Sequence, residues 1–274
     1  MAQPSSPTHS EYTRPMAGNS TYPAVAPPVS PYGQPTGTGV VPPAVAAAAA
    51  ERGLGEYMET YQPKRNSNWI IMPVLVVCIL LIWCVFPIYI MWLLFRTPNL
   101  NRKRAAHRIY VYERGFILAT TPDTPDVWRW SDIDTVFQKI VVQRVYGMTT
   151  GTTYVYTVNR NDGVRLKLTN FWTDIEKLGR HINIHVGGAL LPAMRRALAA
   201  GQGVQFGDIV IDRTGVTGKK GKVSWADVKA VDTAAGYVRV SVQGKFFALS
   251  STRAAKVPNL PLFFALTKEL RQAS

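Results

Sequence analysis

One stretch of the sequence constrains the fold more than any other. Residues 66–95 contain no Asp, Glu, Lys or Arg, and from Trp69 onward nearly every side chain is apolar. About 20 consecutive apolar residues span a bilayer core as a helix, so this run is long enough to cross with some tilt. A helix buried in a protein core rarely stays apolar on every face over such a length. The sequence therefore predicts a single transmembrane helix over residues 66–95.

The apolar run divides the chain into a tail, an anchor and a folded body. The tail, residues 1–65, is rich in Pro, Ala, Ser, Thr and Gly and has no period of 2 or 3.6 residues, so we expect it to be disordered. Within it, residues 44–53 are expected to form a short frayed helix at most. Cys78 and Cys84 both lie in the apolar run, so the remaining sequence offers no disulfide and no thiolate metal ligand.

Basic residues gather directly after the apolar run, in a linker over residues 96–106 and at the start of the body. They are Arg96, Arg102, Lys103, Arg104 and Arg108, whereas only Lys64 and Arg65 lie close on the other side. The flank richer in Lys and Arg usually stays in the cytoplasm. The pattern predicts a single-pass protein of the cell membrane with a cytoplasmic body and an extracytoplasmic tail. The five residues after the run are predicted to contact the membrane surface.

The body repeats itself, which predicts two homologous domains over residues 107–200 and 201–274. Three blocks occur twice in the same order: RIYVYERGF (108–116) with DIVIDRTGV (208–216), WSDIDTV (130–136) with WADVKAV (225–231), and GVRLKL (163–168) with GKFFAL (244–249). Runs of period 2 within each copy predict short strands, among them residues 136–145 and 152–159. Each copy then ends in a predicted helix.

The helix of the first copy is expected to start at a capping box, Thr173-Asp174-Ile175-Glu176. A second helical stretch over residues 190–199 is expected to stop at the glycines of residues 201–203. In the second copy, Pro258 and Asn259 precede the helical pattern LPLFFALTKEL.

These motifs resemble those of bacterial pleckstrin-homology-like (PH-like) proteins, and more closely those of a single-pass, tandem-domain family of uncharacterised function. The resemblance rests on the glycine turns, the two W-x-D-[IV]-x-x-V blocks, the glycine before the last strand and the V-P-N at residues 257–259, and it covers residues 108–270. It implies an α+β protein in which one transmembrane helix is followed by two PH-like antiparallel β-barrels, each closed by a C-terminal helix. It brings no catalytic residue with it.

Candidate chemistry in the sequence is sparse. His181 and His185 lie one helical turn apart, but a third ligand at useful spacing is missing, so we predict no metal site. The motifs of hydrolases, nucleotide-binding loops and metalloproteases are absent, so we predict no cofactor and no catalytic residue. The formal net charge of +14 would suit nucleic acid, but no stacking platform or recognition helix stands out, so we predict no nucleic-acid partner.

The best charged candidate is the sequence GKKGK over residues 218–222. Lys219, Lys220 and Lys222 on glycine hinges are predicted to hold an anionic headgroup, and the alternative is a solvated turn. The sequence therefore predicts a non-enzymatic, membrane-anchored binding or scaffold protein that recognises anionic lipid headgroups or a membrane protein partner. The alternatives are an enzyme with a cryptic site and a purely structural component of a membrane complex. The oligomeric state stays open.

Overall fold

The structure is a computed structural model that describes residues 41–65, 68–80, 85–95, 97–98, 101–121, 125–146, 148–244 and 250–273. Contacts divide the chain into residues 1–34 and 35–274, and all described residues belong to the second unit.

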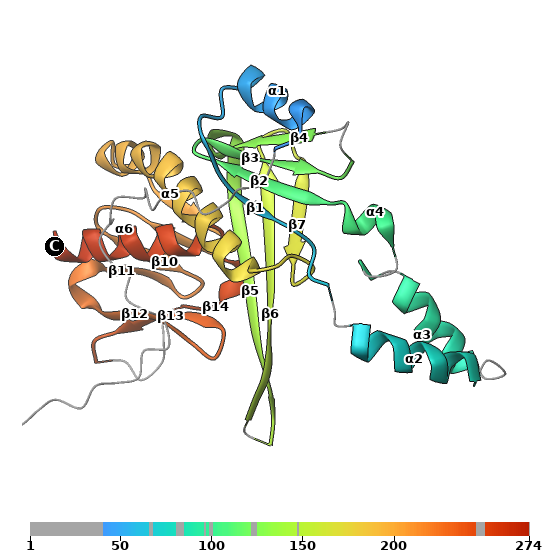
Figure 1. Cartoon of the computed structure of the whole chain (residues 1–274). Helices are drawn as coiled ribbons and strands as arrows, with labels where there is room; N and C mark the ends of the chain where they lie inside the picture. The colour runs from blue at the N-terminus through green and yellow to red at the C-terminus, as the bar shows by residue number, and fades with distance from the viewer. Residues whose placement is uncertain are drawn as a thin grey trace, which may run out of the picture. The chain divides into compact units, whose positions relative to one another are not determined.

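The helices and strands of this unit follow one order twice (Figure 1). The first repeat contains β1 (Tyr57–Tyr61), β2 (Arg108–Tyr112), β3 (Gly115–Ala119), β4 (Pro125–Arg129), the 3-10 turn η1 (Trp130–Asp132), β5 (Ile133–Val145), β6 (Met148–Arg160), β7 (Arg165–Thr169) and α5 (Ile175–Ala199). The second contains β8 (Val204–Phe206), β9 (Ile209–Ile211), β10 (Gly215–Gly218), β11 (Gly221–Ser224), η2 (Trp225–Asp227), β12 (Val228–Ala234), β13 (Tyr237–Val242), β14 (Ser250–Arg253), η3 (Ala254–Lys256) and α6 (Leu260–Gln272). The described residues also form α1 (Pro43–Glu51), α2 (Asn68–Leu80), α3 (Val85–Phe95) and α4 (Arg102–Ala105).

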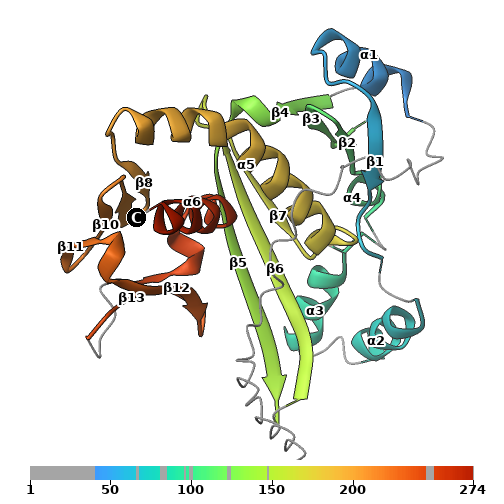
Figure 2. The ribbon, with the colours of Figure 1, turned by 90° about the vertical axis from the view of Figure 1, so that its left-hand side faces the viewer.

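Each repeat has two open antiparallel sheets (Figure 2). The strand orders are β1-β2-β3-β4 and β5-β6-β7 in the first repeat, and β11-β10-β9-β8 and β12-β13-β14 in the second. The prediction of closed barrels was therefore wrong. Between the two sheets of each repeat the chain makes a 3-10 turn, η1 or η2, which interrupts the backbone ladder where a barrel would have to continue.

Tryptophan and glycine fix this corner in the same way in both repeats. The Trp130 indole N–H donates to the Glu113 carbonyl at 3.0 Å, and that of Trp225 donates to the Asp212 carbonyl at 2.8 Å. A Cβ at Gly115 or Gly215 would collide with the backbone carbonyl of the neighbouring strand. The first two paired blocks of the sequence thus mark equivalent turns of the fold, whereas residues 245–249 of the third lie outside the described residues.

Helix α5 joins the two hydrophobic cores. Ile182 and Val186 are buried in the core of the first repeat, and Leu198 is buried in that of the second. The two predicted helical stretches are one continuous helix, since α5 runs unbroken from Ile175 to Ala199. The last turn of α5, with Leu198, thus belongs to the core of the second repeat, although it lies before the predicted domain boundary at residue 200.

The short helix expected at residues 44–53 is present as α1. The prediction that the rest of residues 1–65 is disordered was wrong for residues 57–61, which form β1. Val45 and Ala49 lie on one face of α1 and are buried with Ile117 and its neighbours. Strand β1 pairs with β2, with Tyr61 opposite Ile109. Residues 1–40, including most of the predicted tail, lie outside the described residues.

The predicted capping box does not form either. Asp174, the residue before α5, is left-handed with φ of 47° and its side chain caps nothing. Thr173 Oγ1 donates to the carbonyl of Gln62 at 3.0 Å, and Glu176 accepts from the Tyr154 hydroxyl at 2.8 Å. Gln62, which directly follows β1, thus accepts the Thr173 hydroxyl hydrogen bond in place of a local helix cap.

Candidate interaction surface

The apolar run of the sequence lies between two paired strands. Helices α2 and α3 both belong to the connection from β1 to β2, which are antiparallel neighbours. Beside them, the Lys64 N–H donates to the Phe171 carbonyl at 2.7 Å, and the His107 ring meets the Phe171 ring edge-on at 6.0 Å between centroids. The chain thus leaves the fold and returns to it at one place.

The prediction of a single transmembrane helix was wrong. Helix α2 has 13 residues and α3 has 11, which gives lengths of about 20 and 17 Å against a bilayer core of about 30 Å. Among the described residues, no helix combines the length and the apolar character needed for a crossing. The cell-membrane localisation, the cytoplasmic body and the extracytoplasmic tail were all deduced from that crossing, so they are not supported.

Large apolar side chains on both helices are exposed to solvent. Met72 is 61% exposed and Phe95 56%, whereas Cys78 is buried. The other large apolar side chains that the structure describes as exposed on these helices are Val74, Val76, Val77, Ile79, Tyr89, Trp92 and Leu93. Helices that are apolar on every face cannot cover each other completely, and exposed apolar patches commonly mark interaction sites. We call α2 and α3 the apolar hairpin.

Exposed basic residues lie at both ends of the apolar hairpin. We call them the basic rim: Lys64, Arg65, Arg102, Lys103 and Arg104. Helix α4, which carries three of them, is capped by Asn101 Oδ1, which accepts from the Arg104 N–H at 3.2 Å. Arg108 differs, because its guanidinium donates to the carbonyls of Ala105 and His107 at 2.6 and 2.8 Å and so holds the end of α4. Arg96 lies outside the described residues.

The apolar hairpin, inserted between β1 and β2, lies within the part of the chain that matches a known family. The family model described as "Family of unknown function (DUF6585)" matches residues 44–274. The chain belongs to this family. The match includes nearly all of α1, β1, the apolar hairpin and both repeats. Searches among curated proteins and among solved structures found no match.

The lysine turn of this DUF6585 protein is largely neutralised. Lys219 Nζ lies 3.1 Å from Asp208, and Lys222 Nζ donates to Asp212 at 2.6 Å. Burial alone would raise the pKa of Asp212, but hydrogen bonds from Lys222, Thr214 and the backbone N–H groups of Thr214 and Gly215 lower it to about 2. Asp212 thereby organises the turn before β10, and its negative charge compensates the positive charge of Lys222, one of the predicted site residues.

The two histidines of α5 are packed against the first core. The His185 ring stacks on Trp130 with 5.2 Å between centroids, and the His181 ring lies 6.3 Å from that of His185. Burial lowers the pKa of both imidazoles. Within the described part of the chain, no group of three His, Cys, Asp or Glu side chains could hold a metal ion.

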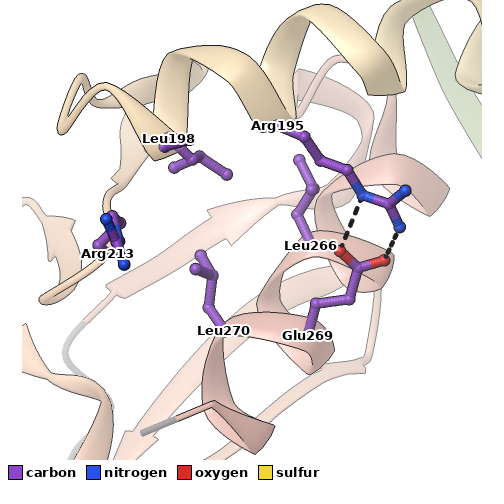
Figure 3. Close-up of a pocket in the computed structure, with 7 residues that line it drawn as sticks. Arg195, Leu198, Arg213, Leu266, Glu269 and Leu270 are labelled. Atoms are coloured by element: carbon purple, nitrogen blue, oxygen red, sulfur yellow. Dashed lines mark hydrogen bonds and ion pairs between the residues drawn. The ribbon is translucent and has the colours of Figure 1, made fainter.

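A shallow depression of about 260 Å³ lies between the end of α5 and α6 (Figure 3). It is lined by Arg195, Leu198, Ala199, Arg213, Leu266, Glu269 and Leu270. The Arg195 guanidinium donates to both carboxylate oxygens of Glu269, at 3.1 and 2.5 Å. Because that carboxylate is engaged, the depression offers apolar and cationic contacts rather than a free base.

Strands β5 and β6 form a long arm in the DUF6585 chain. Each has 13 residues, whereas β7 pairs only with residues 155–159 of β6, so the ribbon continues beyond the sheet (Figure 1). The exposed apolar side chains of the arm are Ile140, Val141, Val142, Val145, Tyr146 and Met148. The sequence predicted these strands but not the exposure. The available signal was the run of consecutive aliphatic residues at 140–142, which does not alternate as a half-buried strand does.

Proposed function

We propose that the DUF6585 chain is a non-catalytic binding protein that attaches to an anionic lipid surface from one side. The observation that carries this proposal is the position of the apolar hairpin between paired strands, with the basic rim at its base. In a lipid surface, apolar acyl chains lie below the anionic headgroups. The protein matches this order, because its basic rim lies at the base of the apolar hairpin. This attachment involves no crossing of the bilayer.

The two parts of the surface contribute differently. A large apolar side chain contributes about 1.5–3 kcal/mol when fully buried, whereas each basic residue near an anionic surface contributes about 1 kcal/mol. The apolar hairpin therefore provides most of the affinity. The basic rim provides the preference for anionic lipid and makes binding depend on salt, because charges are screened over about 10 Å at 0.1 M.

The second repeat supports a role beyond folding for the hairpin. There, β8 and β9 are joined by Gly207 and Asp208 alone. The fold thus connects the corresponding strands without any inserted helix. The resemblance to PH-like proteins and the headgroup site at Lys219, Lys220 and Lys222 remain predictions.

The basic rim can be tested by sedimentation of the full chain with vesicles of phosphatidylcholine, with and without anionic phosphatidylglycerol. Changing Arg102, Lys103 and Arg104 to Ser should weaken binding to anionic vesicles by about a hundredfold at low salt. A matched control changes Lys229, Arg239 and Lys268 to Ser, which removes the same charge from exposed positions of the second repeat. Equal losses from the two triple variants would show that only net charge matters.

The apolar hairpin and the lysine turn are tested by two more variants. Trp92→Asp with Phe95→Asp should abolish binding to both kinds of vesicle. The triple Ser variant of Lys219, Lys220 and Lys222 should bind nearly as the unchanged protein does, because two of these lysines are paired with aspartates. A large loss from it would move the site to the lysine turn. If the unchanged protein binds neither vesicle, the lipid proposal is wrong and the hairpin must contact a protein.

A further inference from the structure

The outer edge of β5 is closed near its start by the second repeat. The Val136 N–H donates to Asn259 Oδ1 at 2.9 Å, and the Asn259 N–H donates to the Val136 carbonyl at 2.9 Å. Both backbone polar groups of Val136 therefore point away from β6. Asn259 directly precedes α6, so one repeat already uses this edge to pair with the other.

Farther along, the same edge is open. Backbone groups in a strand point alternately to its two sides, so those of Gln138, Ile140 and Val142 point outward as those of Val136 do. The described part of the chain supplies these groups with no strand and no hydrogen-bond partner. The arm thus presents a row of unpaired donors and acceptors, flanked by Ile140 and Val142 side chains that are 40% and 49% exposed.

The opposite edge of the arm is partly covered. Beyond the end of β7, Asn170 Oδ1 accepts from the Tyr154 N–H at 2.7 Å, and Asn170 Nδ2 donates to the Thr152 carbonyl at 2.8 Å. The side chain of Asn170 thereby continues the ladder on β6. The edge available for pairing is the one on β5.

The arm is also an addition to the repeat. Its counterparts β12 and β13 have 7 and 6 residues and turn at Ala235 and Gly236, so the repeat folds with a short hairpin at this place. A two-stranded ribbon is only marginally stable in water, and an open edge is a template for another strand. An arm of this length therefore requires a further strand to pair with its open edge.

We propose that the β5 edge pairs antiparallel with the β5 edge of a second copy, about a twofold axis at Val141. In this register Ile140 lies opposite Val142 of the second copy, and Val141 meets its own equivalent. Lys139 lies opposite Gln143, so no two cations are directly opposed. In an antiparallel pair, residues whose backbone groups point toward the partner strand lie opposite each other. On β5 these are the even-numbered residues, so a register that places odd-numbered Lys139 opposite even-numbered Arg144 cannot form. This self-complementarity favours a second copy, and it continues an edge that Asn259 already uses.

A cysteine at the proposed axis tests the register. In the full chain with Cys78→Ser and Cys84→Ser, held in a nonionic detergent that covers the apolar hairpin, Val141→Cys should form a covalent dimer on mild oxidation. Residues at such a non-hydrogen-bonded pair have Cα atoms about 4.5 Å apart, within disulfide reach. Thr149→Cys, exposed on β6 of the same arm, is the control and should react at least about tenfold more slowly.

A proline tests the backbone pairing independently. Val142→Pro removes an outward N–H and leaves the bonds between β5 and β6 in place, as an edge strand tolerates. Two bonds related by the axis are lost, so the dimer dissociation constant in sedimentation should rise about thirtyfold, with circular dichroism checking the fold. A monomer at all concentrations, equal crosslinking at residues 141 and 149, or a dimer unaffected by Val142→Pro would overturn the proposal.

Discussion

At the residue scale, Asn259 holds the two repeats together. It is 5% exposed and left-handed, with φ of 49°, and its side chain donates to the Asp134 carbonyl at 2.9 Å in addition to the two bonds with Val136. Asn tolerates this backbone region better than other non-glycine residues. One side chain thus bonds two backbone groups of a strand more than a hundred positions away.

Asn259→Ala should lower the free energy of unfolding by about 2–4 kcal/mol. It leaves the buried Val136 N–H without an acceptor and places Ala in a left-handed conformation. Asn259→Gly separates the two effects, because glycine adopts this conformation without strain. Urea denaturation should therefore rank the proteins as unchanged, then Gly, then Ala. An Ala variant as stable as the unchanged protein would mean that the contact between the repeats does not depend on this residue.

Some single residues could be interpreted from the sequence and others could not. Trp130 and Trp225, with Gly115 and Gly215, stand at equivalent turns because packing and close backbone approach are local requirements that recur in each copy. The V-P-N motif was also visible in the sequence. Its bonds to Val136 were not, because they depend on where the second repeat lies against β5.

At the scale of elements, the glycines of α5 differ in the space that a side chain would have. A Cβ at Gly187 or Gly188 would meet nothing within 4 Å, whereas a Cβ at Gly179 would collide with the Tyr156 ring. Glycine in a helix interior costs about 1 kcal/mol relative to alanine. Gly188→Ala should therefore stabilise the chain by about 0.5–1 kcal/mol.

Gly179→Ala is the matched comparison, since it makes the same chemical change in the same helix. It should destabilise the chain, because the buried ring of Tyr156 has to move. Thermal denaturation followed by circular dichroism measures both. A destabilised Gly188→Ala variant would show that α5 needs flexibility at the passage from one core to the other.

The apolar run shows where sequence reasoning about elements fails. Its composition alone indicates one membrane-spanning helix, since length and lack of charge are all that the pattern contains. The decisive fact lies outside the run: YMETY at residues 57–61 is a strand that pairs across it with β2. That short segment has no clear alternation, so only its pairing identifies it as a strand.

At the scale of the whole molecule, stability should depend on pH through the histidines. Burial lowers the pKa of His181, His185 and His107 in the folded chain, and the unfolded value is about 6.5. Below that pH the unfolded chain binds more protons than the folded one, so the free energy of unfolding should fall as the pH drops from about 7 to 5.

Urea denaturation across this range tests the effect, and the double variant His181→Gln, His185→Gln should show a shallower slope. Asp212, with its pKa near 2, is ionised in the folded and unfolded chain above about pH 5 and does not interfere. An unchanged slope in the double variant would assign the pH dependence to other groups.

The pairing of β1 with β2 also sets an order of events during synthesis. Strand β1 leaves the ribosome before the apolar hairpin, and its partner leaves after it. At about 5–20 residues per second, the nascent chain carries an unpaired strand and an uncovered apolar segment for several seconds. The first sheet cannot be completed until the hairpin has been made, so whatever shelters the hairpin acts before the first repeat has folded.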